Sequence, residues 1–233
     1  MADAARAVKR FYTAASVGEG RRILLDGKNV KTPGRRDLAL PTDALADAIA
    51  DEWNAQDQEI DPRAMSLTGL ANAAIDRIAP DPEAFARGLA IYGESDLLCY
   101  RAEGPAPLVS RQAESWDPIL AWAQQRYEVV IELASGITHM PQPAETVARL
   151  NAAVAARDAF ALAGLSPLVT ISGSLLVALA LAEGAISLGT AWAAATLDEQ
   201  WQTEKWGEDS EAAASLANRR RDFEAAARFL ALL

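Results

Sequence analysis

The spacing of apolar residues changes at Pro41, and this change most restricts the folds open to the chain. Upstream of it, residues 22–25 and 28–31 flank Asp26-Gly27, a dipeptide that favours the positive φ angles of a two-residue hairpin turn. Downstream of it, apolar positions recur at helical spacing over most of the chain. The sequence therefore predicts an α+β, mostly α fold.

The same change of pattern predicts two domains. We expect a small N-terminal β-rich domain over residues 1–41, followed by a larger all-α helical domain over residues 42–233. Thr42 or Asp43 should cap the first helix. Later apolar runs and helix-ending residues predict helices over about 67–78, 81–99, 108–127, 144–160, 167–183, 188–206 and 209–230, with residues 128–133 extended. Such helices with short loops form a bundle or an orthogonal array.

Three residues near the change of pattern are candidates for a structural motif. Trp53 follows Leu45 and Ile49 on one helical stripe, so we expect it to pack inward. Asn72 and Asp76 lie one helical turn apart and can hydrogen-bond to each other. This pair has two interpretations, a contact with a partner protein or polar structure within the fold.

Composition restricts the class of partner. The 233 residues carry a net charge of -10, which argues against nucleic acid or an anionic membrane as partner, because both require a basic face. The apolar run 168–182 is about fifteen residues long, short of the roughly twenty that span a bilayer, so we expect no membrane insertion. The start of the chain has no apolar signal-peptide core, and Cys99 has no cysteine to pair with. We therefore expect a cytoplasmic bacterial protein.

Catalytic motifs are scarce. The single histidine, His139, has no cysteine or second histidine near it in the sequence, so we expect no metal site. Gly27-Lys28 is followed by Asn29 and belongs to a turn, which is not the pattern of a phosphate-binding loop. We expect no cofactor, no ATP hydrolysis and no enzymatic activity.

The densest segment of the chain is 197–209, where thirteen residues include two tryptophans and five carboxylates. As a helix it would present Leu197, Trp201 and Glu204 on one face. The opposite face would carry Glu199, Thr203 and Trp206.

Gly207 should end this helix in a left-handed cap, and a second helix should begin directly after it. The segment therefore predicts two helices joined by a sharp corner. Three interpretations are open. The acids and tryptophans form a partner-binding surface, or the tryptophans pack in the core while the acids form a solvated rim, or two of Glu199, Glu204 and Glu208 act as the carboxylate pair of a hydrolase.

Two blocks of sequence closely resemble the Atp12 family of assembly chaperones for the F-type ATP synthase. The C-terminal block consists of Leu197, Asp198, Glu199, Gln202, Glu204, Trp206, Gly207 and Glu208. The N-terminal block consists of Ala39, Leu40, Pro41, Thr42, Glu52, Trp53, Gln56, Ile60, Met65, Leu67, Thr68, Leu70, Asn72 and Asp76. After Glu208 the chain lacks the histidine that often follows in eukaryotic members.

The resemblance implies a function and a site. It implies an ATP-independent chaperone, expected to be monomeric, that binds the unassembled alpha subunit and masks its interface until the beta subunit competes. The partner-binding residues would be Glu199, Gln202, Glu204, Trp206, Gly207 and Glu208. The alternative functions are a generic protein-binding scaffold and the carboxylate-pair hydrolase.

Overall fold

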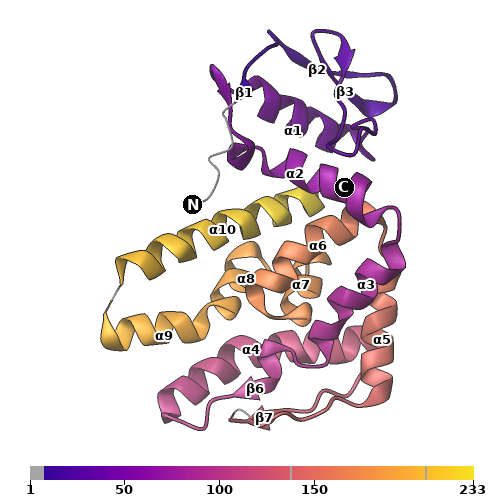
Figure 1. Cartoon of the computed structure of the whole chain (residues 1–233). Coiled ribbons are helices and arrows are strands. Elements are labelled where there is room, and N and C mark those ends of the chain that lie inside the picture. Colours follow the sequence, from indigo (N-terminus) through magenta and orange to yellow (C-terminus); the bar gives the residue numbers. More distant parts are fainter. Residues whose placement is uncertain (1–7, 137, 208) are drawn as a thin grey trace.

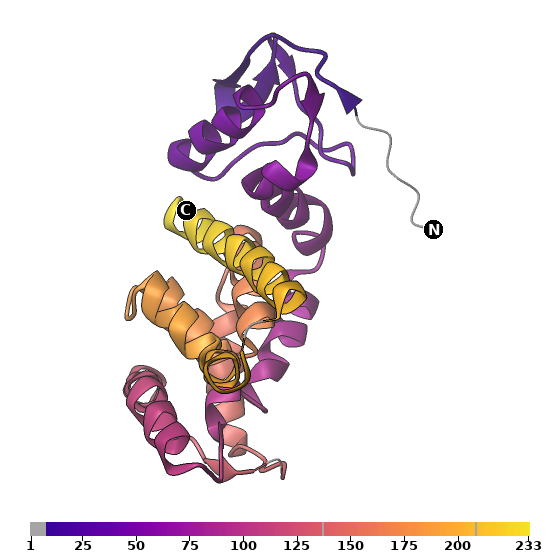
Figure 2. The ribbon, with the colours of Figure 1, turned by 90° about the vertical axis from the view of Figure 1, so that its left-hand side faces the viewer.

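The computed structural model describes residues 8–136, 138–207 and 209–233 (Figure 1). Within these ranges ten α-helices are accompanied by a few short strands, so the expected α+β, mostly α fold is confirmed. Both views place the β-rich N-terminal unit at one end of the molecule and α4 (Ala106–Tyr127) at the other (Figures 1 and 2).

The N-terminal unit is built on a three-stranded antiparallel sheet of β2 (Ala15–Gly18), β3 (Arg22–Leu25) and β4 (Lys28–Asn29). Its β3–β4 turn has positive φ at Asp26 (47°) and Gly27 (80°), as the Asp-Gly signal predicts. Alternate residues of β3 are buried, which directs one face of the sheet to the core.

Helix α1 (Asp43–Asn54) packs on this sheet, and Thr42 caps it by accepting a hydrogen bond from the Leu45 N–H at 3.2 Å. The next strand, β5 (Glu59–Ile60), pairs with β1 (Val8–Lys9). Segments on both sides of residue 41 therefore pack together, and a domain boundary at that residue stays a prediction.

Nine further α-helices lie in the remainder of the described ranges. They are α2 (Ser66–Ala73, continued by a π-helix over Ala74–Ile78), α3 (Pro82–Ala90), α4, α5 (Ala144–Ala155), α6 (Ala159–Ser172), α7 (Leu175–Ala182), α8 (Leu188–Ala195), α9 (Leu197–Trp206) and α10 (Ser210–Ala231). Single-turn 3₁₀ helices cover Glu19–Arg21, Pro62–Ala64, Ile91–Gly93 and Leu97–Cys99, and β6 (Tyr100–Arg101) pairs in parallel with β7 (Ala134–Ser135).

The centre of the helical part is α7. Its residues 175–180 are all buried, which is the pattern of a helix enclosed on every side. Helices α6 and α10 pack closely because Gly164 lacks a side chain: a Cβ there would lie 2.7 Å from the side chain of Leu230. None of the helices in the described ranges is long and apolar enough to cross a membrane.

Several predicted helix limits are wrong. The helix expected to begin at Pro167 begins at Ala159, because Asp158 caps it by accepting from the Ala161 N–H at 2.8 Å. The helix expected to reach Cys99 ends at Ala90 and gives way to single 3₁₀ turns. The helix predicted over 188–206 is divided at Thr196. Residues 128–133, expected to be extended, belong to no strand and lead into β7.

Candidate functional site

The acidic segment forms a corner between α9 and α10. The Gly207 N–H donates to the carbonyl of Thr203 at 2.9 Å, and Asp209 caps α10 by accepting from the Glu211 N–H at 3.2 Å. The predicted order of helix, corner, helix is confirmed. Gly207 has the positive φ that a left-handed cap requires, 89°, but its ψ of 169° lies outside the left-handed helical region, so the cap is of another type that favours glycine. Glu208 lies outside the described residues.

Helix α9 lies mostly on the surface. Of its ten residues only Leu197 is buried. Trp201 is partly buried, and the Lys205 ammonium group stands 4.8 Å from the centre of its ring. Trp206, at the C-terminal end, is 79% exposed, the highest value among the large apolar side chains of the described chain. The two tryptophans therefore lie in different environments, one against the fold and one in solvent.

The acids of α9 are engaged within the protein. Both carboxylate oxygens of Glu204 accept hydrogen bonds from Arg111 Nη1 on α4, at 2.9 and 2.8 Å. On the other side Glu199 forms an ion pair with Arg219 on α10. Figures 1 and 2 accordingly place α9 between α4 and α10.

A third polar link joins the start of α9 to α4. The Gln112 amide donates to Asp198 at 2.8 Å, and the amide oxygen of Gln112 accepts from the Ala102 N–H at 2.9 Å. Because Gln112 is buried, it ties α9 to the interior of the fold. Sequence reasoning missed Gln112, Arg111 and Arg219, since no local pattern connects them with α9.

Of the six residues expected to bind a partner, the structure describes five, and all five are exposed. Glu199 and Glu204 also contact arginines of the neighbouring helices. The two acids face different helices, so they do not converge on one point as a catalytic carboxylate pair must.

Trp53 lies between the N-terminal sheet and the rest of the fold. Its ring packs edge-on against Tyr12 with the centroids 5.7 Å apart, and the Tyr12 hydroxyl donates to the Trp53 carbonyl at 2.6 Å. The side chain contacts the core but is only partly buried, and its Nε1 has no hydrogen-bond partner among the described residues. Trp53 therefore packs inward at the edge of the core.

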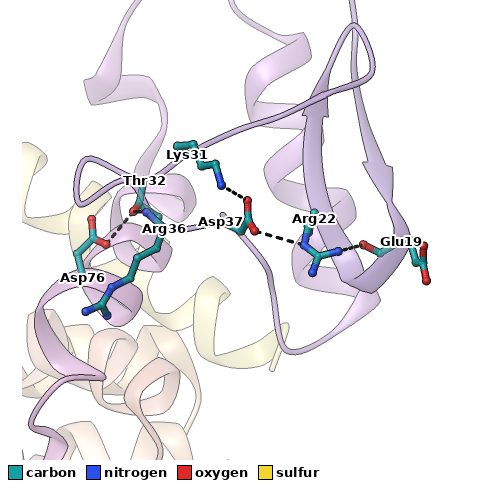
Figure 3. A network of polar contacts seen from close by, with 7 residues as sticks. All are labelled: Glu19, Arg22, Lys31, Thr32, Arg36, Asp37 and Asp76. Atoms are coloured by element: carbon teal, nitrogen blue, oxygen red, sulfur yellow. Dashed lines mark hydrogen bonds and ion pairs between the residues drawn. The ribbon is translucent and has the colours of Figure 1, made fainter.

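Asp76 forms hydrogen bonds with the loop that follows β4. Its carboxylate accepts from the Thr32 hydroxyl at 2.7 Å (Figure 3). It also accepts from the Gly34 N–H at 2.7 Å. The carboxylate therefore bonds to the loop, and the expected bond to Asn72 does not form. The Asn72 side-chain oxygen is buried without a partner among the described residues. This geometry supports the interpretation of Asp76 as polar structure within the fold.

The single histidine and cysteine occupy separate positions. His139 Nδ1 lies 3.0 Å from the Tyr100 hydroxyl. Cys99 is buried, and this burial raises the pKa of its thiol to about 12. In the part of the chain that the structure describes, no group of three or more His, Cys, Asp or Glu side chains could hold a metal ion.

Comparisons with known proteins agree on one family. The family model described as ATP12 chaperone protein matches residues 9–124. The chain is 26% identical over 214 residues to mitochondrial protein atp12 of Schizosaccharomyces pombe, covering 85% of this chain and 74% of that protein.

Solved structures extend the likeness over nearly the whole chain. The crystal structure of Atp12 from Paracoccus denitrificans is 42% identical and superimposes with a TM-score of 0.92, covering 97% of this chain and 98% of that one. A substituted variant of the same protein has a TM-score of 0.91, with 97% of each chain covered. The chain described here therefore belongs to the Atp12 chaperone family.

Proposed function

We propose that this protein is an ATP-independent assembly chaperone that binds the unassembled alpha subunit of the F-type ATP synthase and masks its interface with beta. Membership of the Atp12 chaperone family supports the chaperone activity. The observation that carries the choice of site is the exposure of Trp206, 79%, at the tip of a helix that is itself held by ion pairs. Large exposed aromatic side chains of this kind are typical anchors of protein interfaces.

The client-binding surface is the α9 tip, which we define as Gln202, Trp206 and Gly207, and it is supported by Glu204 and by the more distant Glu199 in the first turn of α9. Glu208, which lies outside the described residues, belongs to the same proposal through its position in the family motif. Trp206 supplies contact area, and the negative charge around it attracts a basic client face. The net charge of -10 extends this attraction to the whole molecule.

Under this proposal, release of the alpha subunit does not require ATP hydrolysis. An unassembled subunit exposes apolar surface that promotes aggregation, and a binder of modest affinity protects that surface until the true neighbour competes for it. We further propose that the protein works as a monomer in a bacterial cytoplasm and has no enzymatic activity. The separate ion pairs of Glu199 and Glu204 argue against these two acids acting together as the carboxylate pair of a hydrolase.

The test is size-exclusion chromatography of the purified chain mixed with separately expressed, soluble alpha subunit. We expect co-elution with free alpha at a ratio near one to one, and no complex with beta or with the assembled catalytic head. Binding to the assembled head would instead favour a scaffold. Absence of a complex with folded, soluble alpha would overturn the proposal.

A further inference from the structure

Burial alone does not account for the position of α9. Leu197, the one buried residue among its ten, lies at the N-terminal end, where Asp198 is also tied to the buried Gln112. The C-terminal end, which carries the exposed Trp206, has no such anchor in the interior. The position of Trp206 therefore depends on surface contacts further along the helix.

Two ion pairs supply surface contacts, one in the first turn of α9 and one near its C-terminal end, and they act on different sides of the helix. Glu199 and Glu204 are five positions apart, which is about 140° around a helix at 100° per residue. Glu199 accordingly meets Arg219 on α10, and Glu204 meets Arg111 on α4. The Glu204 pair lies within one turn of Trp206, with both carboxylate oxygens accepting from one guanidinium nitrogen.

We propose that Arg111 and Arg219 are positioning residues that hold α9 between α4 and α10, and so fix the direction in which Trp206 meets the client. Glu204 and Glu199 then contribute to client binding mainly through these two arginines. Only the binding measurement of this inference rests on the proposed function. The position of α9 can be measured in the isolated protein.

The physical basis is the partial exposure of both pairs. Each side chain of the two pairs is between 36% and 52% exposed, so each attraction is modest and is weakened by salt. Besides these pairs, α9 is held by the buried Leu197, the Gln112–Asp198 hydrogen bond and the partly buried Trp201, so it should open locally from its C-terminal end while the core stays folded. Reversing one arginine places two carboxylates together and changes an attraction into a repulsion.

The first measurement is amide hydrogen exchange of the isolated protein, comparing the wild type with Arg111→Glu and Arg219→Glu. We expect the amides of α9 to exchange about threefold to tenfold faster in each variant, with no change in the buried helix α7. The matched control is Arg220→Glu, because Arg220 is adjacent to Arg219 and undergoes the same charge change but pairs with Glu224 inside α10. Unchanged exchange of α9 in both variants would overturn the inference.

The second measurement separates positioning from direct contact. Arg111→Glu should weaken alpha-subunit binding, and the double variant Arg111→Glu, Glu204→Arg should restore both α9 protection and binding, because it rebuilds the pair with exchanged signs. Arg111→Lys, which keeps the charge, should retain most of the binding. If the double variant regains α9 protection yet still binds weakly, Glu204 contacts the client directly and the inference is wrong.

The two measurements also distinguish this inference from the proposed function. If the wild type fails to bind alpha but α9 responds to the arginine variants as expected, the proposed function fails and the positioning of α9 by Arg111 and Arg219 stands. If the wild type binds alpha while α9 exchange and binding are indifferent to both arginines, the proposed function stands and the positioning role fails.

Discussion

The Asp96 carboxylate accepts a 2.7 Å hydrogen bond from the hydroxyl of Ser174, the residue that caps the central helix α7. It also accepts from the backbone N–H groups of Leu98 and Leu176, each at 3.0 Å. These bonds join the loop before β6 to the start of α7. Asp96 is 1% exposed, and its burial outweighs the hydrogen bonds and raises the pKa of the carboxyl group to about 6.

This pKa predicts a pH dependence of stability. Since the folded protein binds the Asp96 proton more tightly than the unfolded chain, whose carboxyl titrates near 3.8, the contribution of Asp96 is most favourable at low pH and is lost as pH rises towards 6. The free energy of unfolding of the wild type relative to Asp96→Asn should fall by about 2 kcal/mol between pH 4 and pH 7. Urea unfolding of both proteins across this range measures the difference, and a flat difference would contradict the prediction.

Trp116 should contribute strongly to stability. Its side chain is fully buried on α4, and its Nε1 donates to the Ala194 carbonyl at 3.0 Å, which joins α4 to the end of α8. Trp116→Phe removes the donor and part of the ring, and should lower the free energy of unfolding by about 2 to 4 kcal/mol. Trp122→Phe, at a partly buried position on the same helix, is the control and should cost less. Equal losses in urea unfolding would show that the buried bond is unimportant.

Elements with local signals were the ones that the sequence could predict. The turn at Asp26-Gly27, the Thr42 cap of α1 and the start of α3 at Asp81 each depend on residues within one turn of the chain, and all three are confirmed. The corner at Gly207 was predicted for the same reason, and its φ is positive as expected, although its ψ lies outside the left-handed helical region.

Features that depend on distant residues were not predictable in this way. Pro167 indicates a helix start, but the Asp158 cap and burial between α7 and α10 extend α6 through it. The candidate site shows the same limit. The motif identified Glu199 and Glu204, while their partners Arg219 and Arg111 are 20 and 93 residues away and become visible only in three dimensions.

Gly34 should be intolerant of a side chain. A Cβ at this position would lie 2.5 Å from the Asp76 carboxylate that accepts the Gly34 N–H, so Gly34→Ala must move the loop and weaken that bond. We expect a loss of about 1 to 3 kcal/mol in the free energy of unfolding. Gly69→Ala in α2 is the control: a Cβ there meets nothing within 4 Å, and alanine should stabilise the helix by about 0.5 to 1 kcal/mol. Thermal or urea unfolding should therefore shift in opposite directions for the two variants.

Trp206 should affect binding without affecting stability. Because the side chain is 79% exposed, Trp206→Ala should change the free energy of unfolding by no more than about 0.5 kcal/mol. If Trp206 is the aromatic anchor proposed above, the same change should weaken alpha-subunit binding at least about thirtyfold. Titration calorimetry with purified alpha subunit measures the affinity, and Val130→Ala, at an exposed apolar residue outside α9, serves as the control. A stable Trp206→Ala variant with unchanged affinity would place the client contact elsewhere on the molecule, whereas a large loss of stability would show that the exposed ring supports the fold.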